Sequence, residues 1–225
     1  MIGIGLAVSR SSSGPWSLTR ALRWPHLWYS YHLVWTGNFE AAISEAKRAQ
    51  ELDPHSLVAN TSVANILYDG KQYDEAIEQC RRVLELDSGF RWAHHSLGED
   101  YVEKGMFKEG VAELTLGLDP ERRNPHFIAK LAYGMARSGD RSGALKIVAE
   151  LERESQQRYI PPSQIAAVYV ALGDKQQALA WLEKAYQVRD SWFPGAITVE
   201  PPFKPLHSDP RFRDLVLRVG LKPGE

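Results

Sequence analysis

Two adjacent histidines, His94 and His95, are the most metal-like pair in this 225-residue sequence. Chelation by one helix needs ligands that share a face, as residues at positions i and i+4 do. Neighbouring residues on a helix point about 100° apart, so this pair cannot close a chelate. We therefore predict no metal site and no cofactor.

The other reactive groups are explained without catalysis. Cys80 lies in an apolar column of the sequence, which favours a buried structural thiol over a nucleophile. Carboxylate pairs such as Asp74-Glu75 are not fixed against a second pair, and we interpret them as solvated helix faces. The glycines fit a repeat and form no phosphate-binding loop. The sequence predicts that the chain is not an enzyme.

A step of 34 residues is the strongest pattern in the chain. It carries a small residue in five successive copies: Ala42, Ala76, Gly110, Ala144 and Ala178. Five residues upstream, a second column keeps the same step with Gly37, Gly105, Gly139 and Gly173, whereas Gly70 arrives one residue early. A step held this regularly indicates identical supersecondary units stacked in a row.

Each unit has the pattern of two helices. A glycine followed by a polar residue ends the first helix, and acidic or polar residues then begin the second. In the third unit Leu97, Gly98 and Tyr101 show the alternation of large and small residues on the buried face of the first helix. We predict an all-α chain, an α-α superhelix of about five helix-turn-helix repeats with a C-terminal capping helix.

These residues resemble the tetratricopeptide repeat. That pattern has Leu-Gly and Tyr on the first helix, here Leu97-Gly98 and Tyr101, and a small residue followed four later by an apolar one, here Ala76 and Cys80. The resemblance covers roughly residues 23–190. It implies a right-handed solenoid that acts as a non-catalytic scaffold for protein–protein interaction.

The sequence divides into three zones. Residues 1–22 are predicted to be a flexible tail, because their Ser, Gly and Pro run cannot nucleate a packed helix. Residues 23–190 are the array, with units that start near residues 23, 57, 91, 125 and 159. Residues 191–225 leave the period as a proline-rich linker and a capping helix, whose Phe212 and Val216 share one face.

The third zone resembles a narrower group. The stretch from Trp181 to Tyr186, the prolines after it and Ser208-Asp209-Pro210 look like the C-terminal end of bacterial proteins in which such repeats follow a winged-helix regulator, an adenylate cyclase or a serine/threonine kinase domain. This implies an alternative role as the detached regulatory part of a bacterial signalling protein. The 22 residues before the array cannot hold such an output domain, and the sequence leaves both roles open.

The composition limits the partners. The chain has 27 basic and 28 acidic residues and no basic stripe, so we do not expect it to bind nucleic acid. Its single cysteine fits a reducing compartment, and no apolar run approaches the ~18 residues of a membrane span. We predict a cytoplasmic location without membrane contact. The exposed ends of a short array leave a homodimer open.

The resemblance places the partner, a peptide or helix, in a concave groove formed by the first helix of each unit. The columns expected there are aromatic in the N-terminal half, and aromatic side chains are favoured anchors of peptides. Alternatively, Trp24 and Trp35 only cover the exposed first repeat or the tail. The residues predicted to bind the partner are Trp24, Leu27, Tyr31, Trp35, Asn65, Tyr68, Trp92, His95, Glu99 and Tyr133.

Overall fold

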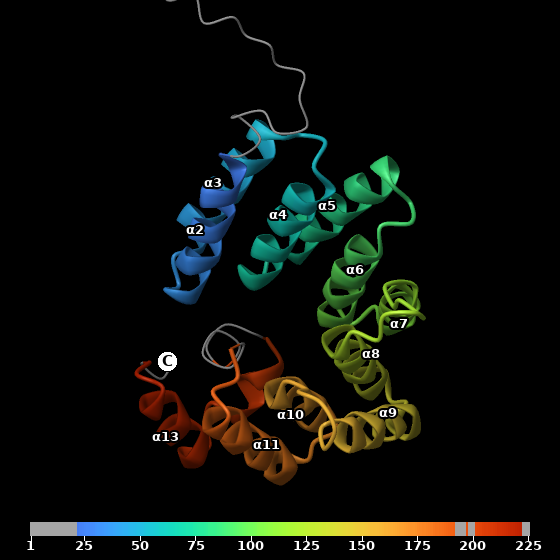
Figure 1. Cartoon of the computed structure of the whole chain (residues 1–225), viewed down its shortest axis with the longest axis vertical. Coiled ribbons are helices and arrows are strands. Elements are labelled where there is room, and N and C mark those ends of the chain that lie inside the picture. Colours follow the sequence, from blue (N-terminus) through green and yellow to red (C-terminus); the bar gives the residue numbers. More distant parts are fainter. Residues whose placement is uncertain (1–21, 192–196, 198–200, 222–225) are drawn as a thin grey trace, which may run out of the picture.

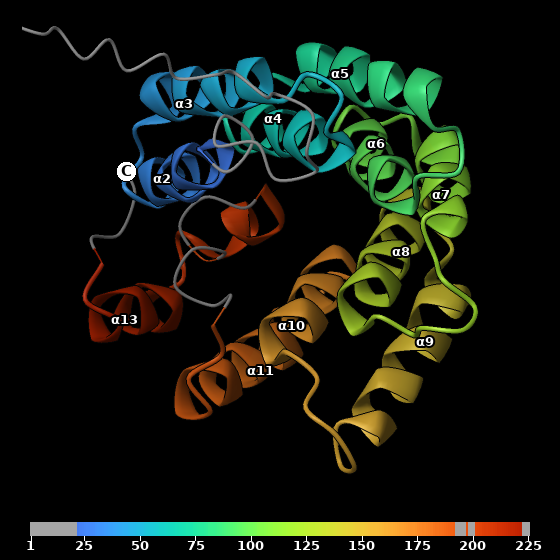
Figure 2. The same cartoon turned by 45° about the horizontal axis from the view of Figure 1, so that its top comes forward.

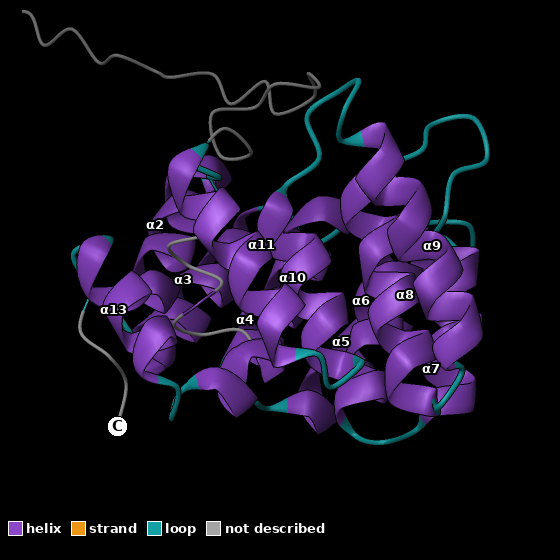
Figure 3. Cartoon of the chain, turned by 90° about the horizontal axis from the view of Figure 1, so that it is seen from below, coloured by secondary structure: helices purple, strands orange, loops and turns teal. Residues whose placement is uncertain are grey.

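The computed structural model describes residues 22–191, 197 and 201–221, and every regular element in these ranges is a helix (Figure 3). The elements are α2 (Arg23–Trp35), α3 (Phe39–Leu52), α4 (Leu57–Asp69), α5 (Tyr73–Leu86), α6 (Arg91–Glu103), α7 (Phe107–Leu116), α8 (Pro125–Ser138), α9 (Arg141–Glu154), α10 (Pro162–Ala171), α11 (Lys175–Gln187), the 3-10 helix η1 (Pro201–Leu206) and α13 (Pro210–Arg218). The predicted tail lies outside the described residues, apart from Leu22.

Consecutive helices form five hairpins, and the hairpins stack into one curved array (Figure 1). Helices α2, α4, α6, α8 and α10 line the inner side of the curve, and α3, α5, α7, α9 and α11 lie outside them (Figure 2). The predicted solenoid of five helix pairs is confirmed.

The 34-residue step is visible in the backbone. The glycines at positions 37, 105, 139 and 173 all have φ between 78° and 92°, the left-handed conformation that ends a helix at least cost in glycine. In the second repeat the corresponding position is Lys71, which adopts φ 60° itself because Gly70 comes one residue early. The sequence shift therefore moves a strained conformation onto a lysine.

The small-residue column marks the closest approach of paired helices. Ala42, Ala76, Ala144 and Ala178 have no exposed surface. In the third repeat α6 and α7 are so close that a Cβ atom built on Gly98 would lie 2.7 Å from the backbone nitrogen of Leu114. A larger residue at this step would push the two helices of a repeat apart.

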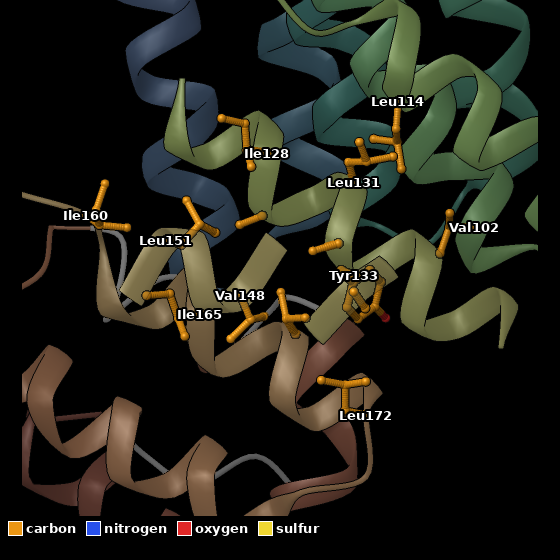
Figure 4. Packing of buried hydrophobic residues seen from close by; sticks show 14 residues of the cluster. Val102, Leu114, Ile128, Leu131, Tyr133, Val148, Leu151, Ile160, Ile165 and Leu172 are labelled. Atoms are coloured by element: carbon orange, nitrogen blue, oxygen red, sulfur yellow. The ribbon is translucent and has the colours of Figure 1, made fainter. Parts of the chain in front are cut away.

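The core follows the array instead of forming a single centre. Its largest cluster in the middle of the chain joins side chains of α6 to α10, including Leu114, Leu131, Val148 and Ile165 (Figure 4). Further clusters continue it towards both ends. Each repeat is thus stabilised mainly by its neighbours.

The described part of the C-terminal zone packs against the fifth hairpin. Phe203, Phe212 and Val216 stand 34 residues after Tyr169, Ala178 and Leu182, and all three are buried. Helix η1 contacts α10, and α13 contacts α11, so both pack on the last hairpin. The prolines of this zone fit a short 3-10 segment, since proline disrupts the interior of an α-helix. The part of the predicted linker at 192–196 and 198–200 lies outside the described residues.

Candidate interaction surface

Helix α2 carries four of the five exposed tryptophan and tyrosine side chains in the described residues, the fifth being Tyr159. Trp28 is 71% exposed and Trp35 is 56% exposed, and Trp24 and Tyr29 are also exposed. The columns of Trp28 and Tyr29 are buried in every later repeat, because the preceding hairpin covers them there. Trp24 and Trp35 belong instead to the columns that the sequence pattern predicts on the inner side of the curve. Among the described residues, the face of α2 that carries Trp28 and Tyr29, here called the stacking face, is left exposed.

Polar side chains connect the first three inner helices. Tyr31 of α2 hydrogen-bonds to Ser62 and Asn65 of α4, and its burial raises the pKa of its hydroxyl. Ser96 of α6 then donates to Asn65 Oδ1 at 2.7 Å. Two of the predicted binding residues, Tyr31 and Asn65, are thus brought together and are engaged in contacts between repeats.

A second polar group joins the third and fourth repeats. The Tyr133 hydroxyl donates to Glu103 Oε1 at 2.7 Å, and Arg137 donates to the same hydroxyl at 2.6 Å. Arg137 also lies 3.3 Å from Glu103 Oε1. Burial and the Glu103 carboxylate raise the pKa of Tyr133. Its hydroxyl is therefore a neutral donor throughout the physiological range.

The most buried charges on this side of the array lie between α6 and α8. Glu99 Oε1 is 2.7 Å from Lys130 Nζ, and Glu99 Oε2 is 3.2 Å from His95 Nε2. Lys130, with His95 next in strength, holds the pKa of Glu99 below its usual range against the effect of burial. Burial lowers the pKa of His126 to about 3, so its ring is neutral, and Gln164 hydrogen-bonds to it. Glu99 is therefore ionised and His126 uncharged at neutral pH.

Comparison with known proteins was made against family models, curated proteins and solved structures. The tetratricopeptide-repeat family model matches residues 59–90 and 163–191, and no curated protein matches. A thermophilic tetratricopeptide-repeat protein of Thermus thermophilus superposes with a TM-score of 0.61 at 20% identity, over 87% of this chain and 99% of its own. This chain folds as a tetratricopeptide-repeat solenoid.

A second solved structure agrees. PilF of Pseudomonas aeruginosa superposes with a TM-score of 0.55 at 17% identity, over 90% of each chain. The tetratricopeptide-repeat fold suggests a scaffold for protein–protein interaction, and proteins of this fold are generally not catalysts. The comparisons do not address the narrower resemblance to signalling proteins, and that alternative role stays a prediction.

Four predicted binding residues of the solenoid are too buried to meet a partner. Leu27 packs with Ala49 and Ala59, and Tyr68 packs edge-on against Tyr73. His95 stacks on Phe127 with ring centroids 3.8 Å apart, and Tyr133 is enclosed by its polar group. In each case a neighbouring helix covers a column that the sequence pattern placed on the surface.

The remaining predicted residues are at least partly accessible. Trp24 and Trp35 are exposed, whereas Tyr31, Asn65, Trp92 and Glu99 are half-buried. The sequence prediction missed the exposed Trp28 and Tyr29 and the inter-repeat partners Ser96 and Lys130. The sequence feature that links three of these residues is the 34-residue step, which places Trp28, Ser96 and Lys130 in one column.

The other chemical candidates have structural roles in the solenoid. His94 Nδ1 lies 2.6 Å from Glu113 of α7, and His26 is placed likewise against Glu45 of α3, so this column faces the seam between paired helices. Cys80 has no exposed surface, and burial raises the pKa of its thiol. A protonated buried thiol is a poor nucleophile, in line with the predicted structural role.

None of the described helices has both the length and the apolar character needed to cross a membrane.

Proposed function

We propose that the chain is a non-catalytic scaffold that holds a partner peptide or helix against the inner face of its first three repeats, with Trp24, Trp35 and Trp92 as anchors. The observation that carries the proposal is the exposure of Trp24 and Trp35 in two inner columns. Exposed tryptophan side chains lower the solubility of a protein. Tryptophan is also among the residues that most often dominate the binding energy of an interface.

The opposite end of the inner face supports this position for the partner. In the fifth repeat Ser163 is tied to Asp190, with its hydroxyl donating at 2.7 Å, and Ala167 is buried together with Phe203 of η1. The C-terminal zone therefore covers part of the surface that the fifth repeat would offer. The accessible inner residues lie nearer the N-terminal end.

The partner we propose is apolar or aromatic and not acidic. The inner columns carry Asp69, Glu99 and Glu103 in repeats two and three. Lys130 and Arg137 already pair with Glu99 and Glu103, so these cations are engaged and an anionic ligand is disfavoured. The near balance of charge disfavours nucleic acid. The single buried thiol is consistent with a reducing compartment, and we propose a cytoplasmic site of action.

The test is binding to a phage-displayed library of linear peptides, followed by affinity measurements with selected peptides. We expect Trp35→Ala and Trp92→Ala each to weaken binding at least about tenfold, because truncating an aromatic anchor removes its buried contacts. Trp28→Ala is the matched control, as it removes an exposed tryptophan from the same helix but from the stacking column. Unchanged affinity in both inner variants would refute the proposal.

The same control separates a partner from a second copy of the chain. A homodimer formed through the uncovered stacking face would use Trp28 and Tyr29 instead of the inner columns. Light scattering of the wild type and of Trp28→Ala would then show a dimer that the substitution dissociates. A monomeric wild type would exclude this homodimer and would leave the inner face as the proposed binding site.

A further inference from the structure

Three potential metal ligands meet between the third and fourth repeats. His95 and Glu99 lie four residues apart on α6, so they share a face of that helix, and His126 comes from α8. One ligand atom from each residue lies within 4.8 Å of the other two. The sequence prediction of no metal considered His94 with His95, and the fold instead combines His95 with two other residues.

His95 supplies an independent indication of a ligand. Its side chain is almost fully enclosed, at 1% exposure, and neither ring nitrogen has a hydrogen bond of acceptable geometry among the described residues. The stacked Phe127 ring fixes the plane of the imidazole. Nε2 faces Glu99 Oε2 at 3.2 Å, whereas Nδ1 has no such contact among the described residues. A buried nitrogen that makes no hydrogen bond costs about 1–3 kcal/mol, and an ion or a water is one explanation for such a group in a native protein.

The ligand set selects the class of ion. Two imidazoles and one carboxylate suit zinc and its first-row neighbours, whereas calcium and magnesium prefer oxygen ligands alone. Zinc needs Zn–N distances of about 2.0–2.1 Å, so the three side chains must draw closer by small rotations. Gln164 of α10 already hydrogen-bonds to His126, as the outer partners of metal-binding histidines do.

Lys130 is the competing cation. Its ammonium group binds Glu99 Oε1, while Oε2 of the same carboxylate faces His95. One oxygen is therefore directed at the two imidazoles, but the formal charge of Glu99 is already balanced. A divalent ion would lie close to an ammonium group, which lowers its affinity.

We propose that His95, Glu99 and His126 form a binding site for a divalent transition-metal ion such as Zn²⁺, and that Lys130 weakens this site by occupying part of the carboxylate. A bound ion links α6 to α8 directly. Because these are successive inner helices, the ion stiffens the curve of the array between the repeats that carry Trp92 and Tyr133.

The experiment uses the full chain, treated with chelator and then titrated with Co²⁺ or Zn²⁺. Co²⁺ binding is followed by its visible absorption, and Zn²⁺ binding by the thermal midpoint. We expect one Co²⁺ per chain and a rise in the midpoint with Zn²⁺. His94→Gln is the matched control on the same helix and should bind like the wild type, whereas His126→Gln should weaken binding at least about tenfold.

Lys130→Met gives the sharper test, because it removes the competing cation and leaves the carboxylate. Its affinity should rise at least about tenfold, and Zn²⁺ should restore whatever thermal stability the substitution removes. The double variant Glu99→Gln with Lys130→Met removes both charges of this ion pair, so neither is left buried alone. It should lose the gain in metal affinity that Lys130→Met alone gives. Absence of binding in both the wild type and Lys130→Met, or equal binding in the double variant, would overturn the site.

Discussion

Gly98→Ala is the substitution whose effect follows most directly from the packing of the solenoid. The added Cβ atom would lie 2.7 Å from both Leu114 N and Leu114 Cγ, and 2.9 Å from the carbonyl oxygen of Gly110. Two of these three atoms belong to the backbone of α7, so the clash is relieved only if α6 and α7 move apart. Overpacking of this kind costs about 1–3 kcal/mol.

The cost is offset in part by helix propensity. Alanine in place of glycine inside a helix gains about 1 kcal/mol, so the net loss of unfolding free energy should be up to about 2 kcal/mol. Urea unfolding followed by circular dichroism measures this loss as a lower midpoint.

Gly134→Ala is the matched control. Gly134 also lies inside an inner helix, α8, but its added Cβ would meet the side-chain ends Leu114 Cδ1 at 2.9 Å and Val102 Cγ2 at 3.2 Å. Side-chain ends can rotate away, so the propensity gain should nearly cancel the clash and leave the midpoint close to that of the wild type. If Gly98→Ala proves as stable as Gly134→Ala, the close helix approach does not limit stability and the reasoning is wrong.

Two further predictions concern single strained or buried groups. Lys71→Gly should raise the unfolding free energy by up to about 1 kcal/mol, because glycine adopts the observed φ of 60° without the cost that a lysine side chain adds; a lower urea midpoint would contradict this. Asp100 is buried, and burial together with Glu99, Asp69 and Glu103 raises its pKa well above the usual value, while Cys80 donates weakly to it. The folded chain therefore holds this proton at pH values where the unfolded chain has released it. Stability should fall as pH rises from about 4, the unfolded pKa, to the raised folded pKa. Asp100→Asn should be more stable than the wild type at neutral pH and should flatten this slope in urea midpoints measured across pH; an equal slope in both proteins would refute the assignment.

The repeats could be predicted from the sequence because each depends on local rules. Gly139 and Gly173 end helices by conformation alone, and the stripe of Phe212 and Val216 defines a buried face without knowledge of its neighbour. Pro201 and Pro202 disrupt the helical pattern of the C-terminal zone, so the sequence does not show how its residues pack. In the structure Phe203 and Phe212 are buried against the last hairpin.

The accessible surface was harder to predict than the fold. The column of a residue gives the direction in which its side chain leaves its own helix. Whether that side chain is exposed to solvent depends on the side chains of the neighbouring helix. His95 and Trp24 both belong to inner columns, yet Phe127 covers His95 while Trp24 stays exposed on the first helix. Columns compare residues 34 apart. They therefore include the contact of Arg137 with Glu103 but miss the contacts between residues 30 or 31 apart.

The contacts between inner helices follow a different spacing that explains the candidate site. Ser96 lies 31 residues after Asn65, Lys130 lies 31 after Glu99, and Tyr133 lies 30 after Glu103. Side chains on a helix tilt towards its N-terminus. A residue of one inner helix therefore contacts a residue of the next inner helix that lies about one helical turn before the position 34 residues later. Within repeats two to four these pairs engage the polar groups of the inner face with one another. Among the described residues no helix precedes α2 to supply such partners, and Trp28 of α2 stands where later repeats carry Ser96 and Lys130. A partner that approaches the inner face therefore meets the aromatic first repeat with the fewest protein contacts to displace.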